Sequence, residues 1–314
     1  MMPRMSRLAV TALVLALVSL LIALLMHFVI PYPTHHGDRA LLPSLWFFAS
    51  YALGVTGYGA LGIGLVAAIR VAASKGTLRG SGLGCLSMVL AFAAMLIVAA
   101  PGLFRSRMAA NESATNGSLK TIATQQVIFK QQREVDQDGD RVGEYGYLCE
   151  LCGEITPRDK KAKEPISPIY ISQQFMTGGS NEAGIAQKSG YYYRLYLIGK
   201  GGQATDDSAC DGSVTKPSTQ LDPQADQAAV DEQEKHFVVY AWPVELNETG
   251  QRCFFVNEVG ETYGTKMSNT TYTGTNGPAW NAAFKAKGEP FTISGQDAAG
   301  NPDSVDGNLW RPAG

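Results

Sequence analysis

The chain divides into an apolar first third and a polar remainder. Residues 8–104 are overwhelmingly apolar, whereas residues 105–314 are polar, rich in glycine and carry most of the charge. Within the first part, runs without fixed charge cover 8–30, 45–69 and 86–104. About 20 apolar helical residues cross the hydrocarbon core of a bilayer. The pattern therefore predicts three transmembrane helices, with the lipid bilayer as the first partner of the chain.

The third apolar run continues past Pro101 into a polar segment that keeps a helical period. Leu119, Ile122 and Phe129 fall on one face, which is typical of a helix that packs on a sheet. We therefore expect one helix over 84–132, about 49 residues and roughly 70–75 Å long, running from lipid into water. Pro101 is expected to kink this helix rather than end it.

Basic residues predict the orientation of the three spans. The N-terminal flank and the loop between the second and third spans carry five of them: Arg4, Arg7, Arg70, Lys75 and Arg79. Arg105 and Arg107 follow the third span and favour the opposite orientation. Because short cytoplasmic loops are enriched in Lys and Arg, the larger group favours a cytoplasmic N-terminus and places residues 105–314 outside the cytoplasm.

The second span carries a small residue at every fourth position. These residues, which share one helix face, are Ala52, Thr56, Ala60, Gly64 and Ala68. Small side chains let helices approach closely in lipid, where the hydrophobic effect does not drive helices together. The face predicts packing against another helix, from this chain or from other membrane-protein subunits. The alternative is that small residues are simply common in membrane helices.

The polar part shows the pattern of an antiparallel sheet. Alternating apolar and aromatic residues, separated by turn-forming residues, occur at 191–198, 236–244, 253–257 and 261–265. A short helix is expected near 223–234. The predicted fold class is an α+β membrane protein with three transmembrane helices, the third extending to pack on a small sheet of three or four strands. The expected divisions are 1–83, 84–132, 133–287 and an irregular tail, 288–314.

Composition and motifs argue against two large classes of function. The net charge of −2 and the lack of a basic block give no sign of nucleic-acid binding. Neither Gly-x-Ser-x-Gly nor His-Glu-x-x-His occurs, and the glycines at 199–202 lack the spacing of a phosphate-binding loop. We expect no enzymatic activity.

One acidic loop is a candidate calcium site. Its carboxylates are Asp136, Asp138, Asp140 and Glu144. Calcium takes six to eight oxygen ligands, and closely spaced carboxylates can supply several of them. The loop is not an EF-hand, because Arg141 replaces the glycine of the sixth position and Tyr147 replaces the glutamate of the twelfth. The alternative is a solvated loop in which Asp and Gly only form turns.

The polar part also contains four of the five cysteines. They are Cys149, Cys152, Cys210 and Cys253. The Cys-x-x-Cys pair at 149–152 is consistent with half a zinc site, a redox pair or a structural disulfide. In an oxidising compartment, four cysteines most simply form two bridges. We expect the pairs 149–152 and 210–253.

The segment PGLFRSRMAANESATNGSLKTIATQQVIF, residues 101–129, resembles the N-terminal helix of type IV pilins and of the pseudopilins of type II secretion. YYYRLYLIGKGG, HFVVYAWPVE and GQRCFFVNEVGETYGT are similar to the sheet of such proteins. The resemblance implies a bacterial inner-membrane protein with a periplasmic or extracellular domain. The chain departs from the family in two ways. LRGSGLGCLSMVL lacks the acidic residue and the phenylalanine of the prepilin cleavage region, and two extra spans precede it.

These features lead to one preferred function and two alternatives. The preferred function is a structural or accessory subunit of a cell-envelope assembly, held permanently in the membrane. The first alternative is a domain that binds a ligand or partner, like a sensor or an adhesin, on a membrane anchor. The second is an atypical filament-forming pilin that is cleaved near residues 80–84.

Overall fold

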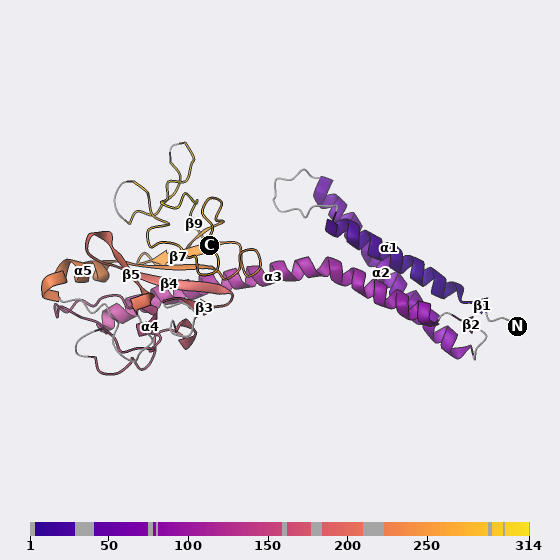
Figure 1. Ribbon diagram of the computed structural model, residues 1–314, viewed down its shortest axis with the longest axis horizontal. Coiled ribbons are helices and arrows are strands. Elements are labelled where there is room, and N and C mark those ends of the chain that lie inside the picture. The colour runs from indigo at the N-terminus through magenta and orange to yellow at the C-terminus, as the bar shows by residue number, and fades with distance from the viewer. Residues whose placement is uncertain are drawn as a thin grey trace. The chain divides into compact units, whose positions relative to one another are not determined.

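The computed structural model describes residues 4–28, 41–74, 78–79, 81–158, 162–176, 184–209, 223–287, 291–297 and 299–313. The chain forms two compact units, Met1–Ser106 and Arg107–Gly314. Three long apolar helices are followed by an antiparallel sheet domain (Figure 1). The predicted α+β fold class is therefore confirmed.

The first unit contains α1 (Arg7–Phe28), α2 (Leu41–Ala73) and the first part of α3 (Ser81–Gln132). All three helices are long and apolar enough to cross a membrane. A short parallel pair joins β1 (Arg4–Met5) to β2 (Leu78–Arg79).

Side chains of different size separate the inner and outer faces of these helices. Large apolar residues such as Val14, Val55 and Val89 are more than half exposed, whereas the buried positions are mainly alanines. Large apolar side chains on the outside are suited to contact with lipid, and small ones on the inside allow close helix packing. This distribution supports the assignment of the first unit to a membrane.

The second unit is built on a seven-stranded sheet. Its strands are β3 (Ala186–Lys188), β4 (Tyr191–Ile198), β5 (Ala204–Asp206), β6 (Phe237–Pro243), β7 (Cys253–Asn257), β8 (Tyr263–Thr265) and β9 (Arg311–Pro312). The order is β3-β4-β6-β7-β8-β9, with β5 also paired to β4, and every pair is antiparallel.

The four predicted strands correspond to β4, β6, β7 and β8, but the prediction of three or four strands is too small. Both β3 and β5 are three-residue strands that pair with different halves of β4. The two-residue strand β9 pairs with β8. Segments this short cannot show a period-two pattern, so the sequence gives no signal for them.

Both faces of the sheet are buried, and the part of α3 that belongs to the second unit covers one of them. Leu119, Ile122 and Phe129 of α3 are fully buried in a core shared with Leu195 of β4 and Val239 of β6. The predicted apolar face of the helix thus packs on the sheet, as expected. Along β6, alternate residues belong to opposite faces, as in any strand.

The C-terminal segment covers the other face. Trp310 is only 2% exposed and packs against Tyr240 and Phe255, with ring centroids 5.9 and 5.3 Å away. Asp306 accepts hydrogen bonds from the hydroxyl of Tyr272 and from backbone and side-chain donors nearby. Trp310, in the segment expected to be an irregular tail, is therefore part of the core of this domain. Its packing partners are aromatic residues of this domain, brought in by an irregular chain path that has no periodic signature.

A second set of contacts ties α3 to the last residues of the domain. The Asn116 amide donates to the carbonyl oxygen of Ala313 (2.6 Å), and the Thr262 hydroxyl donates to the Asn116 amide oxygen (2.5 Å). The helix that opens the domain is therefore joined directly to its sheet edge at β8 and β9.

A buried ion pair fixes the connection between α3 and the sheet. Glu150 lies in α4 (Leu148–Leu151), and its carboxylate is 2.5 Å from the Arg158 guanidinium; both side chains are fully buried. Arg158 also donates to the carbonyl oxygen of Tyr145 and to the side chain of Gln233. Gln233 belongs to α5 (Pro223–Lys235), which agrees with the short helix expected near 223–234. This network joins α4, α5 and the acidic loop region.

Candidate metal centre

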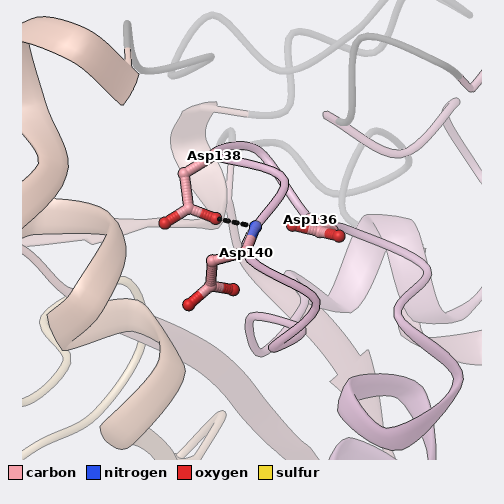
Figure 2. Close-up of side chains that lie close together, drawn as sticks. All are labelled: Asp136, Asp138 and Asp140. Atoms are coloured by element: carbon pink, nitrogen blue, oxygen red, sulfur yellow. Dashed lines mark hydrogen bonds between the residues drawn. The ribbon is translucent and has the colours of Figure 1, made fainter.

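The acidic loop that follows α3 is held by its own carboxylates. Asp136 accepts a hydrogen bond from the backbone N–H of Gly139 (2.8 Å), Asp138 from that of Asp140 (3.1 Å) and Asp140 from that of Val142 (2.7 Å). Figure 2 shows the three aspartates and the bond from the Asp140 backbone to Asp138. One oxygen from each of the three lies within 4.8 Å of the others. The predicted spacing therefore does bring three carboxylates together.

Helix α5 brings further carboxylates to the same place. Oxygens of Asp231 and Glu234 lie within 4.8 Å of each other and of Asp138, so Asp138 belongs to both groups of three. The Gln227 side-chain amide donates to Asp138 and to Asp231, the latter at 2.9 Å. The loop and the helix, distant in sequence, together present five carboxylates.

The carboxylates of the two segments differ in their electrostatics. Glu234 is 9% exposed, and burial, followed by the negative charges of Asp140, Asp138, Glu144 and Asp231, raises its pKa to about 7. For Asp138, burial alone would raise the pKa, but hydrogen bonds from Gln227 and from the Asp140 backbone outweigh it and lower the pKa. The pKa of Asp138 is thus lowered and that of Glu234 raised, so Glu234 holds a proton more readily than Asp138.

Glu144, the fourth predicted ligand, lies beneath the loop. Its side chain is fully buried, one oxygen accepts from the backbone N–H of Gln137 (2.9 Å), and burial raises its pKa. Within the part of the chain that the structure describes, Glu144 is in neither group of three carboxylates. Glu144 therefore supports the backbone of the loop from inside.

Sequence reasoning missed Gln227, Asp231 and Glu234. The available signal was their spacing of four and three residues, which places them on one face of the predicted helix. Nothing in the sequence indicated that this face of α5 would contact the acidic loop, because strands β3, β4 and β5 separate the two segments along the chain.

The cysteine pairing predicted from the sequence is wrong. Cys152 and Cys253 are free thiols and both are buried, which rules out the pairs 149–152 and 210–253. Cys149 is also buried, and Cys210 lies outside the described residues. The Cys152 sulfur faces the carbonyl oxygen of Cys149 at 3.6 Å, so the short helix turns it toward backbone and not toward the other sulfur. Burial raises the pKa of Cys152 to about 12, which keeps this thiol unreactive.

The small-residue face of α2 lies at helix contacts within the first unit. The Ser19 hydroxyl of α1 donates to Thr56 (2.8 Å), and Thr56 in turn donates to the carbonyl oxygen of Ala52. Ala60 is fully buried beside Ala16 of α1 and Ala91 of α3. These positions face both neighbouring helices.

Helices α2 and α3 approach each other closely at Gly64. A Cβ atom at Gly64 would lie 2.6 Å from the Ser87 hydroxyl and 3.1 Å from the carbonyl oxygen of Gly84. A Cβ atom at Gly84 would in turn lie 3.6 Å from that of Ala68. At Gly62 of the same helix, by contrast, no described atom lies within 4 Å of the added carbon. Any side chain at position 64 would therefore require Ser87 or the backbone of α3 to shift.

No protein-family model matches the chain, and neither a curated protein nor a solved structure shows significant similarity to it. The chain is thus defined by its architecture: three long apolar helices, an antiparallel sheet domain packed on the third, and a cluster of carboxylates spaced closely enough that they could hold a metal ion such as calcium.

Proposed function

We propose that the chain is a non-enzymatic, membrane-anchored protein that serves as a structural or accessory subunit of a bacterial cell-envelope assembly. The observation that carries this proposal is the continuity of α3, Ser81–Gln132. Its first part is apolar and packs among the other long helices, whereas Leu119, Ile122 and Phe129 of its second part belong to the core of the sheet domain. One helix thus couples the anchor covalently to the interior of the outer domain.

The proposed orientation follows the basic residues: the N-terminus lies in the cytoplasm, and residues 105–314 lie in the periplasm or outside the cell. A long helix packed on an antiparallel sheet supports the pilin-like character suggested by residues 101–129. An atypical pilin remains the alternative, since cleavage near residues 80–84 would remove α1 and α2. The contacts of Thr56, Ala60 and Gly64 with both other helices support retention of these two helices.

The test combines N-terminal sequencing of the mature protein with extraction in a mild detergent. We expect an N-terminus at Met1 or Met2 and a particle larger than one detergent-bound chain, with other membrane proteins co-purifying. A new N-terminus near Gly84 would overturn permanent anchoring and support the filament-forming alternative. A strictly monomeric protein with nothing bound would contradict the role as a subunit.

A second function, calcium binding by the outer domain, is favoured by the acidic loop. Asp136, Asp138 and Asp140 supply the hard oxygen ligands that calcium prefers, and their oxygens are close enough to surround one ion. Bound calcium would allow the domain to bind a partner in a calcium-dependent manner, as expected for a sensor or an adhesin.

We expect calcium to bind to the full-length protein in detergent with a measurable heat in isothermal titration. Because Asp138→Ala with Asp140→Ala removes two of the three loop carboxylates, the double variant should lose this heat. Glu248, which lies in another loop, provides the control: Glu248→Ala should titrate like the wild type. An absence of calcium-dependent heat in the wild-type protein would refute the site.

A further inference from the structure

We propose that helix α5 completes the calcium site, with Asp231 and Glu234 binding the same cation as Asp138 of the acidic loop. This inference rests on the calcium site proposed above and specifies its ligands. The cation would then join the acidic loop directly to α5.

The first argument is the state of Glu234. Its side chain is nine-tenths buried, and its Oε1 atom is buried without a hydrogen-bond partner among the described residues. A buried polar atom without a partner costs free energy comparable to a lost hydrogen bond, and more when it is charged. The carboxylate lies within 4.8 Å of both Asp138 and Asp231, so a cation bound there would supply the missing partner.

The second argument is the balance of charge. Five carboxylates gather here: Asp136, Asp138, Asp140, Asp231 and Glu234. Within the described part of the chain, none of the five forms a salt bridge with a lysine, arginine or histidine. Lys130, the nearby cation of α3, donates to the backbone carbonyl oxygen of Glu234 and not to its carboxylate. The repulsion among these groups is therefore left for an external cation to offset.

The third argument is size. Calcium–oxygen distances are about 2.3–2.6 Å, so oxygens on opposite sides of one ion are about 4.6–5.2 Å apart. Each group of three carboxylates has its oxygens within 4.8 Å, and the groups share Asp138. Ligands from both segments can therefore reach a single ion, with water filling the remaining positions.

The side-chain amide of Gln227 is placed to act both without the ion and with it. Its amide nitrogen donates to both Asp138 and Asp231 and thus partly neutralises the two carboxylates. Rotation of this amide by half a turn would present its oxygen instead, as a further ligand of the kind that calcium accepts. Gln227 would then bridge the two carboxylates without the ion and coordinate the ion when it is bound.

The decisive experiment is calcium titration of the full-length protein in detergent, with Glu234→Gln compared with Glu232→Gln. Glu232 lies on the same helix but pairs with Lys235 at the surface, so the control removes the same charge from α5 without touching the site. We expect Glu234→Gln to weaken calcium binding by on the order of tenfold or more, because calcium affinity depends on the number of charged ligands. Glu232→Gln should leave it within about twofold.

The outcomes separate this inference from the site on which it rests. If the wild type binds no calcium, the site itself is refuted. If the wild type binds and the loop double variant does not, but Glu234→Gln binds as tightly as Glu232→Gln, then only the participation of α5 is refuted. Hydrogen exchange gives a second readout: calcium should slow exchange in α5 of the wild type, and unchanged exchange there would also count against the inference.

Discussion

Replacing Arg158 with methionine is expected to lower the free energy of unfolding of the sheet domain by about 3–5 kcal/mol, because it leaves the Glu150 carboxylate buried without its partner. Both side chains are fully buried, and the carboxylate also accepts hydrogen bonds from the backbone N–H groups of Tyr147 and Arg158. Loss of the guanidinium further removes donors to Tyr145 and Gln233. The effect should therefore be among the largest of any single substitution in the domain.

The measurement is urea unfolding of the full-length protein in detergent, followed by tryptophan fluorescence. Arg252→Met is the control, since Arg252 pairs with Glu112 at a similar distance, 2.7 Å, but is 40% exposed. Its loss should cost no more than about 1 kcal/mol. Adding Glu150→Gln to Arg158→Met should recover part of the stability by removing the unpaired charge. Equal losses for Arg158→Met and Arg252→Met would contradict the argument.

Replacing Trp310 with alanine is expected to cost about 3–5 kcal/mol, the range for a large aromatic side chain removed from a core. The indole packs on Tyr240 and Phe255, and its N–H donates to Asp306 (3.3 Å). The cavity would open beneath an irregular segment that scattered backbone hydrogen bonds attach to the rest of the domain, such as the bond from the Val305 N–H to the carbonyl oxygen of Phe284 (2.9 Å).

Far-UV circular dichroism during urea unfolding is the suitable measurement, because the substitution itself changes the fluorescence. Val305→Ala is the matched control from the same segment, since Val305 is 46% exposed and should change stability by less than about 0.5 kcal/mol. If Trp310→Ala is as stable as the control, the C-terminal segment is not part of the core.

The regular elements could be predicted from the sequence because their periodicity reports burial directly. Leu119, Ile122 and Phe129 follow the helical period, and all three are in the core. Strand β6 was also predicted, and it is buried along its whole length because both faces of the sheet are covered. The partner on its second face could not be predicted, because the segment around Trp310 has no period.

The acidic site was predictable only in part, for a related reason. Local spacing is sufficient to bring Asp136, Asp138 and Asp140 together, since each turn is closed by a side chain of the same loop. The contribution of Asp231 and Glu234 depends on tertiary packing of α5. The predicted cysteine pairs are wrong for a similar reason. The direction of the Cys152 side chain is set by α4 and not by its distance from Cys149 along the chain.

The hydrogen bond between Asn116 and Ala313 has a consequence for biosynthesis. It joins positions 197 residues apart, and Trp310 and β9 are needed to cover the sheet and its edge. The sheet domain therefore cannot close until residue 313 has been synthesised, whereas the apolar helices of the first unit are synthesised earlier. Folding that depends on such distant contacts is slow. Insertion of the apolar helices into the membrane should thus precede the folding of this domain.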